Sequence, residues 1–393
     1  MKILFIAPYV PSRIRVRPFQ IIKELAKSHE IHIVALDESD GTSTIGIEEI
    51  RDVAASVDII PHSKPKGLLQ ALLSVPLPLP MSAAYCWSQQ MQRTIARVTS
   101  ERSFDIVHVE HLRAAHFAPF GIGVPVIFDA VDCLTSLFRQ MARSKRNLLA
   151  RSILALEAAK LAYYEPRVLQ CFDWVVATSD SEQAALLSLK PGIHVTTVPN
   201  GVDTAYFAPM GTTKTPRRII FTGKMSYQPN AQAALWFAQN VFPRVRARWQ
   251  DAEFVIAGSN PPDSIKALAG IPGITVTGYV EDLRPQLDMA AVAVTPMQTA
   301  VGIQNKVLEA MAMALPVVAS SLATRAIGHG APGIIEANTP DEVATAIDQL
   351  FANPQRSIEL GKQGREFVER QFSWNAAVER LEAIYNELLA KKH

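Results

Sequence analysis

Short apolar runs alternate with longer segments of helical periodicity along almost the whole chain. In the first half, this pattern predicts a helix over residues 17–28, a long helical stretch over 134–169, and strands over 3–7, 31–36, 59–60, 106–109, 126–129 and 174–178. Strands that alternate with helices in this way are typical of a parallel α/β architecture.

The same succession of elements begins again after residue 200. It predicts strands over 218–222, 254–257, 274–277, 292–296 and 316–319, and helices from residue 229, over 303–313, over 340–351 and in two closing segments near 354–370 and 374–391. Pro229 suits the first turn of its helix, and Thr339 is placed to cap the helix at 340–351.

The dipeptide Asn200-Gly201 marks the boundary between the halves, because Asn-Gly accepts the positive φ of a tight turn. We therefore expect two doubly wound domains that face each other across a cleft. Ligands of such sheets bind at the carboxyl ends of the strands. The loops that follow the second-half strands, after Thr222, Gly258, Gly278 and Pro296, are accordingly expected at the cleft.

The composition supports two globular domains and narrows the classes of function. Of 393 residues, 48% are hydrophobic and 19% are charged, and the net charge of +2 argues against nucleic acid as the main partner. The three cysteines lie far apart, which argues against disulfides or a zinc site. The apolar run at 3–7 ends at Pro8, so we interpret it as a strand, not a signal peptide. No apolar run is long enough to span a membrane, and we expect a cytoplasmic protein, attached at most to the inner membrane surface.

The segment from Pro296 to Ala312 carries the sharpest chemical signal. Gly302 is expected to begin a helix whose first backbone N–H groups are free to bind an anion. Lys306 and Glu309 lie three residues apart on one face near that end, where a lysine can neutralise a diphosphate and a carboxylate can accept two hydrogen bonds from a ribose. The alternative is a solvated ion pair. The residues after Glu309 are small or apolar, so we expect this helix to be buried. A charged side chain on a buried helix needs a partner, which favours a bound ligand.

Several short motifs occur together across some two hundred residues. They are Val198–Asp203, Phe221–Lys224, Gly278–Val280, Lys306–Ala312 and Pro316–Ala319, with a looser match at Phe104–His108. Through these motifs, taken together, the chain resembles the retaining glycosyltransferases of family 4, particularly the exopolysaccharide sugar transferases. The resemblance implies the GT-B fold, with two facing Rossmann-like domains at 1–198 and 199–373 and a C-terminal helix, 374–393, that crosses back to the first domain.

The resemblance also implies a donor site for a nucleoside-diphosphate sugar, with no other cofactor and no metal. Lys224 and Lys306 match the catalytic contacts to the diphosphate, although a surface lysine is the alternative for Lys224. Glu309 matches the family's ribose-binding glutamate. The remaining donor contacts would come from the segments of Gly223, of Gly302 and Ile303, and of Tyr279 and Val280, the last two bordering the base.

One position departs from the family pattern. The first glutamate of the family's Glu-x7-Glu motif is replaced by Val301, eight residues before Glu309. In the family this position usually touches the transferred sugar. The departure therefore bears on the identity of the donor sugar more than on the reaction.

The first half is expected to supply acceptor contacts. Glu110 occupies the place of a histidine in relatives, and His111 follows it at the end of a strand. Either could act in catalysis by binding a sugar hydroxyl or the leaving phosphate; the alternative is that a histidine of this cluster, which begins at His108, belongs to the core. Asp129 follows another strand and could line the cleft.

Two further basic segments have two interpretations each. Arg13, Arg15 and Arg17 could bind a phosphate-bearing acceptor or be solvated. A basic amphipathic helix over 139–151 could lie on an anionic membrane, or present a solvated basic face. The sequence Gly328–Gly333 spells GxGxxG, but it contains Pro332 and precedes a strand, so we exclude NAD binding.

The resulting hypothesis is sugar transfer, with retention, to a hydroxyl of a glycan or polyprenyl-linked acceptor in bacterial cell-surface or exopolysaccharide synthesis. Two alternatives stay open. One is a UDP-sugar epimerase of the same fold, and the other is a noncatalytic subunit that binds a partner transferase, which the Val301 departure keeps in view.

Overall fold

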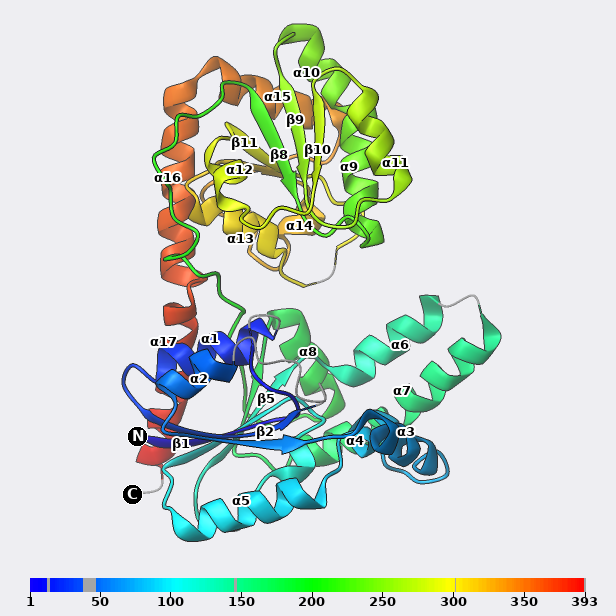
Figure 1. Cartoon of the computed structure of the whole chain (residues 1–393), viewed down its shortest axis with the longest axis vertical. Helices are drawn as coiled ribbons and strands as arrows, with labels where there is room; N and C mark the ends of the chain where they lie inside the picture. Colours follow the sequence, from blue (N-terminus) through cyan, green and yellow to red (C-terminus); the bar gives the residue numbers. More distant parts are fainter. Residues whose placement is uncertain (13–14, 38–46, 145–146, 301, 392–393) are drawn as a thin grey trace. The chain divides into compact units, whose positions relative to one another are not determined.

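The computed structural model describes residues 1–12, 15–37, 47–144, 147–300 and 302–391. The chain divides into two compact units, Met1–Asn200 with Ala377–His393, and Gly201–Ala376. Each unit contains one parallel sheet covered by helices (Figure 1). The expected α/β fold with two Rossmann-like domains is therefore confirmed.

The first unit contains a seven-stranded sheet in the order β3-β2-β1-β4-β5-β6-β7. Its strands are β1 Lys2–Ala7, β2 Glu30–Asp37, β3 Ser56–Pro61, β4 Ile106–Glu110, β5 Val126–Val131, β6 Trp174–Ala177 and β7 Val195–Thr197. All neighbours are parallel, and β1, β4, β5 and β6 are almost wholly buried because helices cover both faces. The strand order reverses between β1 and β4.

The first unit contains more helices than the sequence predicted. They are α1 Val16–Leu25, α2 Ile47–Val53, α3 Lys64–Leu73, α4 Met81–Tyr85, α5 Gln89–Glu101, η1 Ala115–Phe117, α6 Leu134–Ser144, α7 Leu148–Leu169, α8 Asp180–Leu189 and most of α17 Trp374–Ala390. The helical stretch expected over 134–169 is present but divided in two, because α7 begins anew where the Asn147 side chain accepts a hydrogen bond from the Ala150 N–H. The basic helix expected over 139–151 is therefore divided between α6 and α7, and Lys145 and Arg146 lie outside the described residues.

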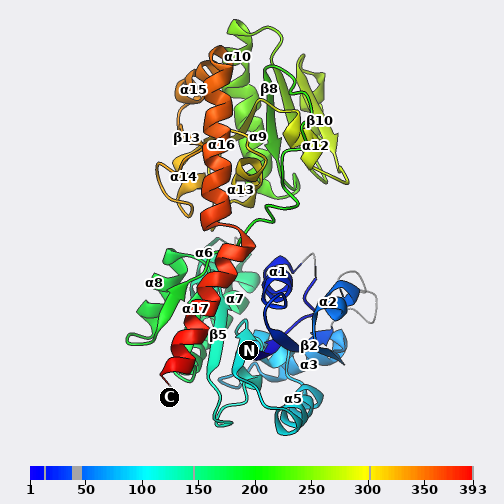
Figure 2. The same cartoon turned by 90° about the vertical axis from the view of Figure 1, so that its left-hand side faces the viewer.

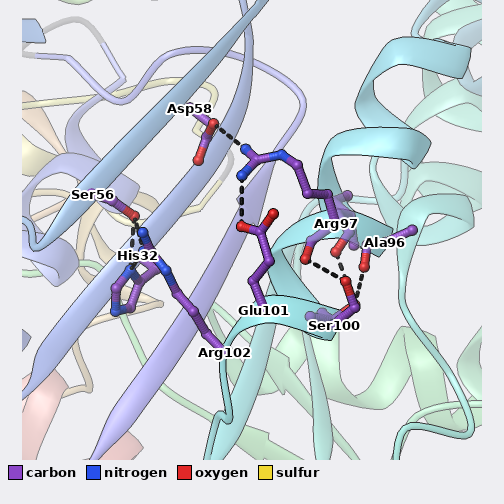
Figure 3. A network of polar contacts seen from close by, with 10 residues as sticks. His32, Ser56, Asp58, Ala96, Arg97, Ser100, Glu101 and Arg102 are labelled. Atoms are coloured by element: carbon purple, nitrogen blue, oxygen red, sulfur yellow. Dashed lines mark hydrogen bonds and ion pairs between the residues drawn. The ribbon is translucent and has the colours of Figure 1, made fainter.

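A polar network fixes α5 to the amino-terminal ends of β2 and β3 (Figure 3). Arg102 donates from Nη1 to Ser56 Oγ at 2.9 Å and lies 2.6 Å from His32 Nδ1. Arg97, one turn earlier in α5, pairs with Asp58 of β3 at 3.0 Å. These contacts attach α5 to the edge of the sheet that lies opposite the carboxyl ends of the strands.

The second unit contains a six-stranded parallel sheet in the order β10-β9-β8-β11-β12-β13. Its strands are β8 Arg218–Thr222, β9 Glu253–Ala257, β10 Ile274–Gly278, β11 Val292–Thr295, β12 Val317–Ala319 and β13 Ile334–Glu336. The order reverses between β8 and β11, which in doubly wound sheets is where ligands bind.

The helices of the second unit form its covering layers (Figure 2). They are α9 Gln228–Asn240, α10 Phe242–Arg248, α11 Asp263–Lys266, η2 Ala267–Gly270, α12 Arg284–Asp288, α13 Asn305–Ala312, α14 Ser321–Thr324, α15 Pro340–Ala352 and α16 Pro354–Gln371. Thr339 caps α15 in a complete capping box with Glu342, as predicted. Strand β13 directly follows Gly328–Gly333, which supports excluding a dinucleotide fingerprint there. Over the described ranges, none of the helices combines the length and apolarity that crossing a bilayer requires.

Two expectations about local backbone are wrong. Neither Asn200 nor Gly201 has a positive φ, so no Asn-Gly tight turn forms. Gly201 is needed for another reason, because a Cβ there would lie 2.7 Å from the backbone nitrogen of Trp374. The helix expected from residue 303 begins at Asn305, and Gly302, with φ +63°, turns the chain before it.

Candidate functional site

A pocket of about 400 Å³ lies in the second unit at the carboxyl ends of β8, β9 and β10, beside the start of α13. Its lining residues are Thr222, Gly223, Lys224, Gly258, Ser259, Tyr279, Val280, Leu283, Ile303, Asn305, Lys306 and Glu309. The structure thus brings together every residue predicted for the donor site except Gly302, which is exposed and not part of the lining. Val301 lies outside the described residues.

Lys306, in the first turn of α13, is held by hydrogen bonds from two sides. Its Nζ donates to Asn230 Oδ1 at 2.9 Å and to Gln304 Oε1 at 3.2 Å. Asn230 is buried in α9, and its Nδ2 donates to the Lys224 carbonyl oxygen at 3.0 Å. Asn230 therefore connects the two segments that carry the lysines. Sequence reasoning missed it, although an asparagine in the first turn of a helix that follows the Gly223-Lys224 loop was an available signal.

Burial governs the charges of this pocket. It lowers the pKa of Lys306 to about 8, while the carboxylate of Glu309 acts in the opposite direction. Burial also raises the pKa of Glu309, against the effect of Lys306. Both side chains are half-buried in the pocket wall, not on a solvated face of α13. Partly desolvated charges of this kind gain most from a ligand that carries complementary groups.

Two glycines let the backbone of neighbouring strand ends approach closely. Gly223 and Gly258 have φ of +150° and +156°, and a Cβ on Gly258 would lie 1.7 Å from the Gly223 carbonyl oxygen. A Cβ on Gly223 would lie 2.7 Å from Asn230 Nδ2. The inner wall of the pocket is therefore bare backbone, which a phosphate could approach without obstruction.

The remaining predicted donor residues lie at the rim or at the helix start. Lys224 is exposed, and Tyr279 is 75% exposed, so both side chains are accessible from solvent. Gln304 is the N-cap residue of α13 but makes no side-chain capping hydrogen bond. The Val307 N–H donates to the Gln304 carbonyl oxygen, so the N–H groups of Asn305 and Lys306 are the ones offered to an anion, at the place where Ile303 and Asn305 line the pocket.

A second group of polar residues lies in the first unit, beyond the ends of β1 and β4. Glu110 is 1% exposed, its Oε1 accepts a hydrogen bond from the Tyr9 hydroxyl at 2.8 Å, and its Oε2 has no hydrogen-bond partner among the described residues. Burial, reinforced by Asp129, raises the pKa of Glu110 to about 8. Glu110 is therefore mostly protonated at neutral pH.

His111 follows with a positive φ of 66°, and its Nδ1 accepts a hydrogen bond from the Arg113 N–H at 3.2 Å. Burial lowers the pKa of His111 to about 3, so the ring is neutral and carries its proton on Nε2. His108 instead belongs to the core: it is fully buried, stacks on Phe5, and its Nδ1 lies 2.8 Å from the Tyr385 hydroxyl.

Neither interpretation of Arg17, as a phosphate-binding or as a solvated residue, fits the structure, because its side chain is buried and bound to Asp129. Arg17 Nε donates to Asp129 Oδ2 at 2.9 Å, and Nη1 donates to the Val198 carbonyl and to Asn200 Oδ1. Both members of the pair are buried. Arg15 lies 4.5 Å from the centre of the Tyr9 ring. The predicted position Arg13 lies outside the described residues.

Within the described ranges, no three His, Cys, Asp or Glu side chains come together as a metal site. The pocket beside α13 offers positive charge through Lys224, Lys306 and backbone N–H groups, and it contains one carboxyl group, that of Glu309.

Two family models match the chain. Residues 16–206 match the model described as Glycosyltransferase Family 4, and residues 216–353 match Glycosyl transferases group 1. The first match includes Glu110 and His111 of the first unit, and the second includes every residue that lines the pocket of the second unit.

Curated relatives of this chain include mannosyltransferases. The phosphatidyl-myo-inositol mannosyltransferase of Mycolicibacterium smegmatis is 24% identical over 355 residues, 86% of this chain and 87% of the relative. The GDP-mannose-dependent alpha-(1-6)-phosphatidylinositol monomannoside mannosyltransferase of Mycobacterium tuberculosis is 30% identical over 155 residues, 35% of this chain. The aligned part spans 40% of that relative's length.

Solved structures share the fold at low sequence identity. Anabaena HepE, in a complex with UDP, aligns with a TM-score of 0.65 and 14% identity over 98% of this chain and 100% of that one. The sucrose-phosphate synthase of Thermosynechococcus elongatus aligns with a TM-score of 0.64 and 15% identity over 100% of both chains.

Proposed function

Because the chain belongs to the family 4 glycosyltransferases and has the GT-B fold, we propose that it moves a sugar from a nucleoside-diphosphate donor to a hydroxyl group, with retention at the anomeric carbon. The observation that carries this proposal is the meeting of Lys224, Lys306 and Glu309 in one pocket at the carboxyl edge of the second sheet.

The proposed roles follow from the chemistry of these groups. Lys306 and the first N–H groups of α13 bind the diphosphate, and Glu309 accepts hydrogen bonds from the ribose diol. Tyr279 and Val280 border the base. When the bond to the sugar breaks, negative charge develops on the diphosphate. Lys224 and Lys306 stabilise that charge and so lower the barrier to departure.

In the first unit, Glu110 and His111 are proposed to bind sugar hydroxyls or the leaving phosphate. Glu110 is protonated at neutral pH because of its raised pKa, and a protonated carboxyl group can donate a hydrogen bond. The neutral ring of His111 has Nε2–H left to donate, because Nδ1 is engaged by the Arg113 N–H. Both groups thus act as hydrogen-bond donors and not as charges.

The class of donor and acceptor is also proposed. One structural neighbour is described with UDP and UDP-glucose, and one relative is described as GDP-mannose-dependent, which supports a hexose carried on a nucleoside diphosphate. The relatives named for phosphatidylinositol support a lipid-linked acceptor, and we propose a glycan or polyprenyl-linked acceptor for this chain. We place the reaction in bacterial cell-surface or exopolysaccharide synthesis, in the cytoplasm.

Calorimetric titration with UDP, GDP and ADP tests the donor site. Lys306→Ala and Glu309→Ala are expected to weaken binding of the preferred nucleotide about ten-fold or more, since each removes a charge-assisted contact. Lys266→Ala is the matched control, because Lys266 pairs with Asp263 in α11 and does not line the pocket. Equal binding by all four proteins would reject the proposal.

The same samples separate the alternatives. Incubation of the donor without acceptor yields an epimerised sugar if the protein is an epimerase. Failure of the wild-type protein to bind any of the three nucleotides points to the noncatalytic subunit instead.

A further inference from the structure

A cluster of exposed leucines covers α3 and the first turns of α7. Leu68, Leu69, Leu72 and Leu73 of α3 are between 55% and 67% exposed, and Leu148, Leu149 and Ile153 of α7 are between 50% and 76% exposed. At 100° per residue, each set falls on a single face of its helix. We call these two faces the leucine surface. An apolar surface of this size on a soluble unit marks an interaction site.

Hydrogen bonds and a shared hollow bring the two helices close to each other. Lys160 of α7 donates from Nζ to the Ser74 carbonyl at 2.6 Å, just after α3. Glu157 of α7 accepts hydrogen bonds from the backbone N–H groups of Met81 and Ser82. A hollow of about 370 Å³ lies between the helices, with walls that include Ala71 of α3 and Ile153 of α7. Figure 1 shows α3 and α7 at the same end of the first unit.

The sequence around the leucine surface is mainly basic, although Glu157 lines the hollow between the helices. Residues 59–100, which contain α3, have four Lys or Arg and no Asp or Glu, and residues 133–156 have five Lys or Arg and no Asp or Glu. Arg139 and Arg143 lie on α6, which packs along α7, and Arg151 lies on α7 itself. A second copy of this chain would bring like charges together and repel. An anionic bilayer offers both the complementary charge and a hydrocarbon layer for the leucines.

We propose that the leucine surface docks on an anionic membrane, with the leucines of α3 and α7 in the hydrocarbon region and the flanking arginines at the lipid headgroups. Only the benefit of docking rests on the proposed function: a lipid-linked acceptor then reaches the enzyme within the plane of the bilayer. It differs from a basic amphipathic helix over 139–151, because α3 supplies half of the apolar contact and no continuous helix spans that range.

Flotation with vesicles of phosphatidylcholine, with and without phosphatidylglycerol, tests the docking. The full chain is expected to float with the anionic vesicles. Leu68→Gln, Leu72→Gln, Leu148→Gln and Leu149→Gln combined in one variant are expected to weaken that binding about ten-fold or more. Ile271→Gln with Ile358→Gln is the matched control, since both side chains are exposed but lie in the second unit, and it is expected to float as the wild type does.

Replacing Arg139, Arg143 and Arg151 with Gln is expected to remove the preference for phosphatidylglycerol and its sensitivity to salt. The leucine variant should keep its melting temperature and its affinity for nucleoside diphosphates, so loss of vesicle binding is separable from failure of the proposed donor site. The proposal is overturned if the wild type does not float, or if the leucine variant floats equally well. It is also overturned if sedimentation shows a wild-type dimer that the leucine substitutions dissociate.

Discussion

Lys306 Nζ donates a 2.9 Å hydrogen bond to Asn230 Oδ1, and through it the start of α13 is coupled to the loop after β8. The amide of Asn230 completes the connection with its bond to the Lys224 carbonyl. The two lysines proposed to bind the diphosphate thus depend on one buried amide. Asn230 is accordingly a positioning residue.

Asn230→Asp should change the titration of Lys306 without removing the contact. The new carboxylate is expected to raise the pKa of Lys306 above its value of about 8, and so to extend nucleotide binding to higher pH. Asn230→Ala should weaken binding about ten-fold at every pH, because the ammonium loses its fixed position. Asn240→Ala, in the last turn of the same helix, serves as the control. Calorimetry at several pH values distinguishes these results from a purely structural role, which would leave the pH midpoint in place.

Donor binding should itself depend on the charge of Lys306. Below a pH of about 8 the ammonium is charged, and above it the free protein increasingly carries a neutral amine. Affinity for a nucleoside diphosphate should therefore fall as pH rises from about 7 to about 9, with uptake of a proton on binding. Calorimetry in two buffers of different ionisation enthalpy measures that proton.

Two variants check that Lys306 is responsible. Lys306→Arg keeps its charge throughout and should abolish the decline. Glu309→Gln removes the group that raises the pKa of Lys306, and should move the midpoint to lower pH. An unchanged pH profile in Lys306→Arg would assign the proton to another group.

Gly258→Ala should damage both the stability of the second unit and its pocket. The added Cβ would lie 1.7 Å from the Gly223 carbonyl oxygen, and the φ of +156° is one that L side chains rarely adopt. We expect a loss of about 1–3 kcal/mol in unfolding free energy from overpacking, with weaker nucleotide binding. Gly270→Ala, which meets open space, should be nearly neutral. Thermal unfolding compares the two, and similar melting temperatures would contradict the role of the close approach.

The elements that the sequence predicted well are those with strong apolar runs. Strands such as β1 and β8 are buried on both faces, so their continuous hydrophobicity is visible in the sequence. The break between α6 and α7 was missed because residues 134–169 are helix-forming on both sides of Asn147, and only its capping role marks a new start. Helix α3 was missed because its leucines are exposed, whereas helix prediction from periodicity assumes that the apolar face is buried.

The candidate site shows the same division between local and distant information. Lys306 and Glu309 were found because one helix turn places them together, whatever the rest of the fold does. Asn230 lies in the connection after β8 and meets Lys306 only in the folded unit, and Gly258, after β9, approaches Gly223 only once the sheet has formed. The functional roles of all of these residues stay predictions.

Glu110→Gln should separate the structural from the chemical role of this carboxyl group. The pKa of Glu110 is about 8 in the folded protein against its ordinary value of 4.5, so the folded state holds the proton more tightly. Stability should therefore fall as pH rises from about 4.5 to about 8. The variant, which cannot ionise, should lack this contribution to the fall. Urea unfolding between those pH values measures the difference.

At neutral pH, Glu110→Gln should fold at least as stably as the wild type, because the wild type must take up a proton at Glu110 on folding and the amide need not. If Glu110 binds substrate through its proton, the variant should still lose sugar transfer about ten-fold, since the amide donor has a different position and acidity. Tyr9→Phe is the comparison, as it removes only the hydrogen bond to Oε1. Full activity of Glu110→Gln with wild-type stability would restrict Glu110 to a packing role.

Arg17→Met should be the most destabilising of these changes, because it leaves Asp129 buried without its partner. Breaking a buried ion pair costs about 3–5 kcal/mol, compared with at most about 1 kcal/mol for an exposed pair. Arg97→Met, which breaks the exposed contact with Asp58, is the matched control. Arg17→Met combined with Asp129→Leu should recover much of the stability, since no unpaired charge then remains. If Arg17→Met is as mild as Arg97→Met in thermal unfolding, the buried pair does not stabilise the first unit as proposed.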